Sequence, residues 1–593
     1  MRRSAFFCLA LFLVAACGSA GLEDRASAEP TASPTRLETN TPTATPTQTP
    51  TPTVTAPAAV VTGELREPLL SAAVRQSGAP CGFVDVLDFP LDAPHGATAS
   101  GGGDFGRFRS RFDGFHTGED WRDGASSFGK PVYSIGHGRV TYAQPNGWGA
   151  DKGVVIVQHV FRDGRRILSF YGHLDPPSID LRAGQCTERG DVIGAIGDPR
   201  SPPHLHFEIR VHLPETPGPG YWSVDPFRAG WRPPSATIWN ERVAALLGVN
   251  WTRLNDAEQL SVIGSVGDAV LIASETGEVM ALDIGDGRTQ WAHELSDTAN
   301  SVLLDARSSL VYVQSAGGVL EAFELSDLAD RDSIPPIDPV WSVELESPGA
   351  YDLISLPSGG LLAYTRSRAE AVSDSGEPMW SEELVSGITD WAHAGEDLVL
   401  FIRDEIWLAE DQGVTRLIGS INGERVVASE QPYIYADDGV YQVDMESGLV
   451  ELWFGLSNGF PRAGSMSEMP GGGILVAHTD LDDKRLIAID EDGLLRWELS
   501  IASLGARAVE LLTLNDEIYM MTQHDIGQAT GVDLFHVGIE TGDLTRIFIG
   551  GTRSTGPNLV RIMGEGDSIL IDITGVGLAV LDPQTALEAV VGE

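Results

Sequence analysis

The feature that most constrains the fold is a repeat in the C-terminal part of the chain. Beyond about residue 240, an apolar strand pattern leads again and again into an acidic turn with glycine, and a tryptophan strand often follows. Clear copies occupy residues 279–291, 441–453 and 487–497. Weaker copies centre near Leu325, Asp374, Glu410, Glu540 and Asp582. The turns recur about every 43 residues, which is typical of one four-stranded propeller blade per repeat.

These repeats predict a β-propeller of seven or eight blades over residues 245–593. We count eight blades, and Trp251 is a candidate for the strand that closes the ring. The repeat tryptophans are interpreted as residues that pack the blades rather than as ligands of a cofactor.

Length and composition agree with a multidomain, all-β protein. A chain of 593 residues is too long for one hydrophobic core, so at least two domains are expected. With 67 glycines and 35 prolines, the chain suits turn-rich β structure. The formal net charge of −44 argues against nucleic acid as a partner, because that requires a basic surface.

Residues 1–17 are interpreted as an export signal. Arg2 and Arg3 precede an apolar run at 5–16 that is too short to span a bilayer, and Cys17 follows. The segment Leu13-Val-Ala-Ala-Cys17-Gly18 resembles the bacterial lipobox, in which the cysteine is lipidated. The prediction is an exported cell-envelope lipoprotein that touches the membrane by its lipid anchor only. The alternative is signal cleavage after Ala20 and a secreted protein.

Residues 18–62 are predicted to be a disordered linker rich in Thr and Pro, because such a segment cannot bury a core. After the signal, Cys81 and Cys186 remain, and in an exported protein they are a candidate disulfide.

The stretch from 80 to 235 alternates short β patterns with glycine turns, so a compact antiparallel β domain is expected. Within it, His204 and His206 are two residues apart on a predicted strand and can face one site. His116 and Asp120 lie too far apart on a straight strand to share a metal ion, so a bend at Gly118 is expected. His116, Asp120 and His206 then form a candidate zinc site with an open fourth position.

Two further histidines are candidate catalytic residues. His204 shares the predicted strand face of His206, and His173 ends the strand Tyr171-Gly-His-Leu174. Either imidazole is suited to take a proton or to stabilise a developing oxyanion. Glu208, on the same face, is interpreted either as a group that orients a ligand histidine or as a packing residue.

The domain resembles the lysostaphin-type, or LytM-domain, zinc metallopeptidases, which cut peptidoglycan peptides. The motifs that carry the resemblance are His116-Thr-Gly-Glu-Asp120, Gly129-Lys-Pro-Val-Tyr133, Gly138-Arg-Val140, Tyr171-Gly-His-Leu174, Arg189-Gly-Asp-Val-Ile-Gly194 and His204-Leu-His-Phe-Glu208. The resemblance implies a β-sandwich-like barrel with the site in an open groove. It also implies that His116, Asp120 and His206 bind Zn²⁺ and that His173 and His204 are the catalytic pair.

One segment departs from the family pattern. The family usually has a glycine-rich turn before the His-x-His motif, whereas this chain has Gly197-Asp-Pro-Arg-Ser-Pro-Pro203. This loop borders the expected groove, so the departure bears on substrate preference more than on metal binding.

The C-terminal repeats resemble the quinoprotein-like (PQQ-type) propellers. The sequence offers no identifiable cofactor pocket or calcium ligands, so a quinone dehydrogenase is the least favoured reading. The leading hypothesis is a surface-tethered zinc endopeptidase acting on peptidoglycan peptides, with the propeller as a platform for wall polymers or envelope proteins. The alternative is a catalytically inactive wall-binding or hydrolase-regulating scaffold.

Overall fold

The structure, a computed structural model, describes most of the chain beyond residue 78. The described residues are 79–591 without 124–125, 212–215, 255–259, 275–276, 296–298, 316, 330–336, 347–348, 385, 395–396, 403–404, 411–412, 419–422, 428–431, 437, 446–448, 456–464, 480–483 and 555–558. The predicted signal with Cys17 and the predicted linker at 18–62 lie outside them.

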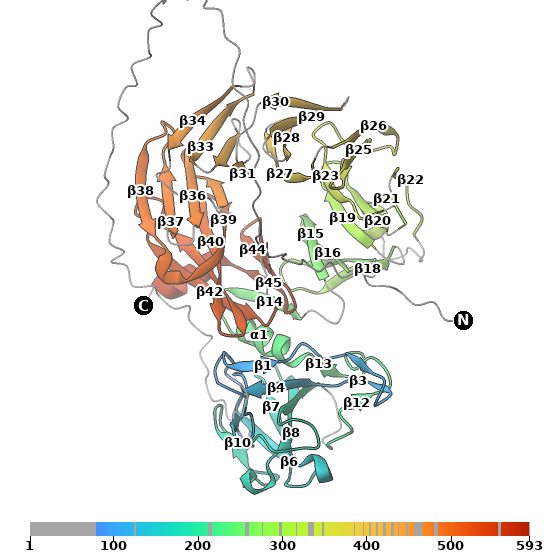
Figure 1. Cartoon of the computed structure of the whole chain (residues 1–593), viewed down its shortest axis with the longest axis vertical. Helices are drawn as coiled ribbons and strands as arrows, with labels where there is room; N and C mark the ends of the chain where they lie inside the picture. Colours follow the sequence, from blue (N-terminus) through green and yellow to red (C-terminus); the bar gives the residue numbers. More distant parts are fainter. Residues whose placement is uncertain are drawn as a thin grey trace, which may run out of the picture. The chain divides into compact units, whose positions relative to one another are not determined.

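The first part of the described chain is built on one eight-stranded antiparallel sheet, coloured blue to green in Figure 1. The strand order is β1 (Ala99–Gly101), β4 (Glu119–Asp123), β11 (Leu205–Arg210), β8 (Arg166–Leu174), β7 (Gly153–Val160), β6 (Gly138–Gln144) and β9 (Cys186–Thr187), with β13 (Trp231–Arg232) also paired to β11. Two smaller sheets contain β2 (Phe108–Arg109), β3 (Gly114–His116) and β12 (Tyr221–Trp222), and β5 (Pro131–Tyr133) and β10 (Val192–Ala195). Short 3₁₀ helices are η1 (Gly149–Asp151) and η2 (Pro176–Ser178).

The middle of the large sheet is buried on both faces. Alternate side chains of a strand point to opposite sides of the sheet, so each face packs its own hydrophobic cluster. In β7, Val155 and Val157 belong to the main core, whereas Val154 and Ile156 belong to a second cluster on the other face. All six residues of β11 are buried. The strand that carries the predicted site is therefore held rigidly between two neighbours.

A disulfide joins Cys81 to Cys186, which are 105 residues apart in sequence. Cys186 begins β9 at one edge of the large sheet. The bond therefore attaches the segment that enters the domain to the sheet edge.

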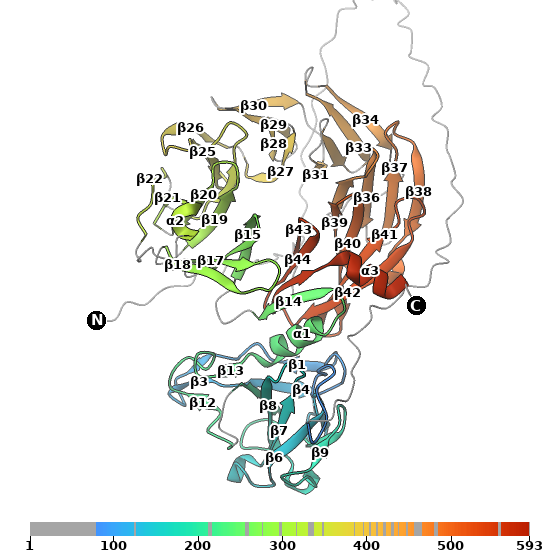
Figure 2. The ribbon, with the colours of Figure 1, turned by 180° about the vertical axis from the view of Figure 1, so that it is seen from behind.

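Within the described residues, the second part forms eight four-stranded antiparallel sheets, which confirms the all-β, propeller-type prediction. Figures 1 and 2 show these sheets following one another around a ring. The first strands of most neighbouring sheets contact one another, as the inner strands of propeller blades do.

The first four sheets contain β15 (Leu260–Val266), β16 (Ala269–Ser274), β17 (Glu278–Asp283) and β18 (Thr289–Glu294); β19 (Ala299–Asp305), β20 (Leu310–Ser315), β21 (Val319–Glu324) and β22 (Trp341–Glu344); β23 (Asp352–Ser355), β24 (Leu361–Tyr364), β25 (Arg368–Val372) and β26 (Pro378–Glu383); and β27 (Ile388–Ala394), β28 (Asp397–Ile402), β29 (Glu405–Glu410) and β30 (Gly413–Ile418). The next three contain β31 (Gly423–Val427), β32 (Tyr433–Ala436), β33 (Gly439–Asp444) and β34 (Leu449–Gly455); β35 (Ser465–Glu468), β36 (Ile474–Thr479), β37 (Lys484–Ile489) and β38 (Leu495–Ser500); and β39 (Ala506–Leu514), β40 (Glu517–Ile526), β41 (Ala529–Val537) and β42 (Leu544–Thr552). The helices are α1 (Pro234–Ala244), α2 (Leu325–Ala329), α3 (Pro583–Val591) and the 3₁₀ helix η3 (Ala502–Leu504).

The eighth sheet closes the ring with strands from both ends of this region. β43 (Val560–Glu565), β44 (Ser568–Ile573) and β45 (Gly577–Leu581) pair with β14 (Val249–Leu254), which comes before the first complete blade. Trp251 lies in this closing strand, as expected. Its indole N–H donates to the carbonyl oxygen of Ile284 in the next blade at 2.7 Å, so the tryptophan packs one blade on another.

Where the structure describes them, the predicted repeat turns lie after the third strand of a blade and lead to its outer strand, as after β17 and β37. The copies near Leu325 and Asp582 differ, because the helices α2 and α3 follow β21 and β45 in place of an acidic glycine turn. Among the described residues, no helix is both long and apolar enough to cross a membrane.

Candidate active site

The site is built where three adjacent strands of the large sheet meet. β11 lies between β4 and β8, and the register places His206 opposite Asp120 on one side and opposite Gly172 on the other. Directly opposed residues of antiparallel strands have Cβ atoms about 4.5–5.5 Å apart. Two residues that are distant in sequence are thereby fixed side by side.

His116 reaches this point from β3, which lies in the small sheet with β12. The chain turns between β3 and β4, as expected, so His116 and Asp120 are on different strands. The reason for glycine at 118 differs from the expectation of a conformational bend. A Cβ there would lie 2.5 Å from the carbonyl oxygen of Phe207 and 3.0 Å from Nε2 of His206, so the glycine is required by space.

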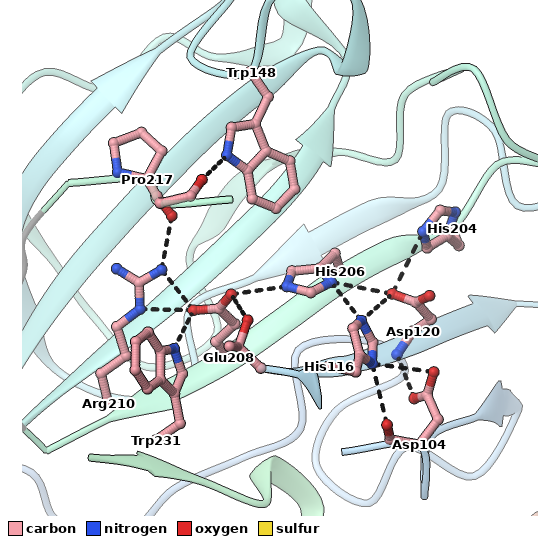
Figure 3. A network of polar contacts seen from close by, with 12 residues as sticks. Asp104, His116, Asp120, Trp148, His204, His206, Glu208, Arg210, Pro217 and Trp231 are labelled. Atoms are coloured by element: carbon pink, nitrogen blue, oxygen red, sulfur yellow. Dashed lines mark hydrogen bonds and ion pairs between the residues drawn. The ribbon is translucent and has the colours of Figure 1, made fainter. Parts of the chain in front are cut away.

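His116, Asp120 and His206 converge on one point (Figure 3), and their ligand atoms all lie within 4.8 Å of one another. His116 Nε2 is 3.1 Å from His206 Nδ1, and Asp120 Oδ1 is 3.2 Å from His206 Nδ1 and 3.4 Å from His116 Nε2. Donor atoms held by one zinc ion at about 2.0–2.1 Å lie roughly 3.3 Å apart in a tetrahedron. The spacing of the three atoms fits such an ion.

The outer partners of the two histidines decide which nitrogen faces the centre. His116 Nδ1 lies 3.2 Å from the backbone oxygen of Asp104 and 3.2 Å from its carboxylate, so Nδ1 carries the proton and donates it. His206 Nε2 lies 2.9 Å from Oε1 of Glu208 and donates in the same way. The inward nitrogens, His116 Nε2 and His206 Nδ1, are therefore lone-pair acceptors.

Three acceptors that face each other are stabilised by positive charge between them, either a proton or a metal ion. Burial opposes a charge on His116, but hydrogen bonds to Asp104 and Asp120 outweigh it and raise the pKa of His116 to about 10. Burial likewise opposes the charge on Asp120, and its contacts with the histidines hold the pKa of that carboxyl well below its usual range. The centre thus attracts positive charge, as a site for a divalent metal ion does.

His204 and His173 lie beside the centre, and both have one nitrogen fixed by a carbonyl. His204 Nδ1 donates to Pro202 at 2.7 Å, and His173 Nδ1 donates to Asp151 at 2.8 Å. The two rings are 4.6 Å apart between centroids, and His204 Nε2 is 3.5 Å from Oδ1 of Asp120. Burial, followed by the neighbouring histidines, lowers the pKa of His173 to about 4, so its Nε2 carries a lone pair rather than a proton near neutral pH.

His173 has a left-handed backbone conformation, with φ of 60°, next to a register shift between β7 and β8. A bulge of this kind re-aims a side chain, and strained residues in strands concentrate at functional sites.

Comparison with known proteins identifies the two parts of the chain. The sequence model of peptidase family M23 matches residues 114–219, a range that includes all five predicted metal-binding and catalytic residues. The chain carries an M23 peptidase domain. The model of the outer membrane protein assembly factor BamB matches residues 232–358, so a BamB-like repeat domain follows the M23 domain.

Several solved structures match about half of the chain at low sequence identity. BamB from Moraxella catarrhalis is 16% identical over a match that covers 57% of this chain and 97% of the BamB chain, with a TM-score of 0.39. Apo AztD from Citrobacter koseri is 12% identical over a match that covers 50% of this chain and 90% of the AztD chain, with a TM-score of 0.35. The computationally designed Ika8 protein is 11% identical over a match that covers 56% of this chain and 99% of the Ika8 chain, with a TM-score of 0.42. No curated protein matches the chain.

Behind His206, the M23 domain contains a buried polar network that local patterns did not reveal in full. Glu208 accepts hydrogen bonds from Thr117, Trp231 and Arg210, at 2.7, 2.9 and 2.6 Å. Arg210 also donates to the carbonyl oxygens at 216 and 217. Of the two interpretations of Glu208, the structure supports the one in which it orients a ligand histidine.

Sequence reasoning also missed Asp104, which holds both His116 and the backbone N–H of Asp120. Its only local signal is its position in a glycine-rich stretch 12 residues before His116.

The centre opens into a groove of about 550 Å³. Its walls are formed by Arg111, Phe112, Asp120, Arg122, Trp148, Asp151, His173, Arg200, Ser201, His204, His206, Gly218, Pro219, Gly220 and Tyr221. Arg200 and Ser201 belong to the loop that departs from the family pattern, so this loop does border the groove, as expected.

Proposed function

We propose that the M23 domain is a zinc-dependent endopeptidase that hydrolyses peptide bonds of peptidoglycan. The observation that carries this proposal is the convergence of two lone-pair imidazole nitrogens and one carboxylate oxygen within 4.8 Å, beside two further histidines in an open groove. Two histidines and a carboxylate that leave one position open are typical of a catalytic rather than a structural zinc site.

His116, Asp120 and His206 would hold the ion. When bound, zinc supplies a Lewis acid that polarises a carbonyl and lowers the pKa of water. The carboxylate of Glu208 and the carbonyl oxygen of Asp104 keep both ligand imidazoles in the required tautomer.

His173 and His204 would move protons at their Nε2 atoms. Each keeps its proton on Nδ1, so Nε2 can accept one from the attacking water and return it to the leaving amine. Once protonated, either imidazolium is also placed to stabilise negative charge on the scissile carbonyl oxygen.

The rest of the chain would place this chemistry at the cell wall. In the proposal, a lipid anchor at Cys17 and the linker at 18–62 hold the enzyme in the envelope. The propeller then acts as a platform for wall polymers or envelope proteins. This part of the proposal is supported by the sequence patterns and by the BamB-like repeats.

The test compares the wild type with His206→Ala and His204→Ala. We expect His206→Ala to lose bound zinc and activity, and His204→Ala to keep zinc but lose activity, measured by metal analysis and by peptide release from purified wall. His137→Ala is the matched control, since His137 belongs to the same domain but does not line the groove. A wild type that binds no zinc and releases nothing from walls of several chemistries would favour the inactive scaffold instead.

A further inference from the structure

The charges that line the active-site groove do not cancel. Arg200 donates to the carboxylate of Asp151 at 3.0 Å, so these two neutralise each other, and Asp120 belongs to the metal centre. Arg111 and Arg122 remain. Among the residues that the structure describes, no carboxylate forms an ion pair with either guanidinium group.

Such an excess of positive charge is unusual in this protein. The whole chain has a formal net charge of −44, with 84 acidic and 40 basic residues. A cleft lined by one sign of charge concentrates ligands of the opposite sign. In a chain this acidic, two unpaired guanidinium groups in the groove set it apart from the average surface.

Arg111 is connected to the metal centre by a series of ring contacts. Its guanidinium lies 5.3 Å from the centroid of Phe112, and Phe112 stacks on Tyr221 at 4.1 Å. Tyr221 in turn lies 5.2 Å from the ring of His116, a predicted zinc ligand. This aromatic stack limits where the Arg111 side chain can go, although the residue itself is exposed.

Arg122 lies on the same strand as a predicted zinc ligand. It follows Asp120 by two residues in β4, so both side chains point to the groove face, about 6–7 Å apart along the strand. The intervening Trp121 points the opposite way and is fully buried. The Arg122 side chain is therefore next to the position where a scissile bond would lie.

We propose that the groove selects peptides with a free carboxylate close to the scissile bond, and that Arg122 and Arg111 bind this carboxylate. This inference rests on the proposed peptidase function and specifies its substrate class. Guanidinium groups suit the task because their fork of N–H donors matches the two oxygens of a carboxylate. Arg122 is the main determinant, because it is next to Asp120, and Arg111 extends the site along the groove.

The test uses two wall peptides that differ only in having a carboxylate or a carboxamide beside the cleaved bond. For the wild type we expect kcat/KM to be roughly 10- to 100-fold higher for the carboxylate, as for a charge-assisted hydrogen bond. Arg122→Gln should reduce this ratio about tenfold, mainly through KM, and Arg111→Gln should reduce it less. Arg166→Gln, an exposed arginine of the same domain outside the groove, is the control for net charge and should keep the wild-type ratio.

A binding measurement makes the result independent of turnover. The zinc-loaded His204→Ala variant should bind the carboxylate peptide about tenfold more tightly than the carboxamide, and adding Arg122→Gln should remove the difference. Equal cleavage of both peptides by the wild type would refute the carboxylate preference and leave the peptidase function standing. Cleavage of neither peptide by zinc-loaded protein would refute the peptidase function, and an equal loss in Arg166→Gln would show that only bulk charge matters.

Discussion

The ion pair behind His206 offers the sharpest test of how the proposed metal centre is supported. The side chains of Glu208 and Arg210 are 0% and 1% exposed, so the pair is fully removed from water. Burial opposes ionisation of Glu208, but Arg210 and His206 outweigh burial and lower its pKa to about 2. Glu208→Gln keeps the size of the side chain and removes its charge.

The expected magnitude follows from the partners that remain. Removing one member of a buried ion pair costs about 3–5 kcal/mol, because the other charge stays buried without compensation. Glutamine still offers one oxygen to Arg210, which itself retains two carbonyl acceptors, so we expect the lower end, about 3 kcal/mol. Zinc affinity should fall by about 10- to 100-fold, because the amide supports the Nε2–H of His206 more weakly than the carboxylate does.

The assay separates the two effects. Hydrogen exchange of the β11 amides in chelator reports the free energy of opening without metal, and competition with a chromophoric chelator reports zinc affinity. Glu188→Gln, at an exposed position of the same domain, should change neither. Adding Arg210→Met to Glu208→Gln should restore most of the stability and none of the zinc affinity. Unchanged β11 exchange and unchanged zinc binding in Glu208→Gln would refute the reasoning.

Three further predictions concern stability elsewhere in the chain. Burial lowers the pKa of His159 to about 4, so the stability that its neutral form contributes should be complete above about pH 6.5 and fall as the pH drops toward 4. His159→Gln should remove up to about 3 kcal/mol of this pH dependence. Urea unfolding at pH 7 and pH 4.5 measures the difference. Replacing Cys81 and Cys186 by serine should lower the free energy of unfolding by about 2–5 kcal/mol, and a reductant should then have no further effect on the melting temperature. Trp251→Ala should cost about 3 kcal/mol, the lower end for a tryptophan, because the side chain is only half-buried. It should also accelerate proteolysis within 249–254, because β14 loses its indole contact with Ile284. An unchanged cleavage rate would mean that this contact does not secure the closing strand.

Local sequence patterns were sufficient for features that depend on neighbours along the chain. The repeat turns around Asp283 and Asp490 define blades because strand alternation and turn chemistry are local properties. The sequence patterns also predicted five metal-binding and catalytic residues by type and spacing. The structure brings His116, Asp120 and His206 together, and Asp120, His173, His204 and His206 line one groove. The same reasoning misjudged why Gly118 is needed, because the crowding comes from β11, about 90 residues away.

The features that the sequence alone could not predict depend on pairing between segments that are distant along the chain. No local pattern shows that Asp120 lies opposite His206, that Asp104 holds His116, or that the closing strand predicted around Trp251 pairs with β45. Nor does a local pattern show that Arg122 forms no ion pair with any described carboxylate while Arg200 is neutralised by Asp151. The sequence by itself determined which elements form and which chemistry they carry, since turns, strand periods and residue types are read within a few positions. Only the tertiary structure decided the tautomers of His116 and His206, the strand with which the closing strand pairs and the charge of the groove, because each requires a contact between residues that the chain keeps far apart.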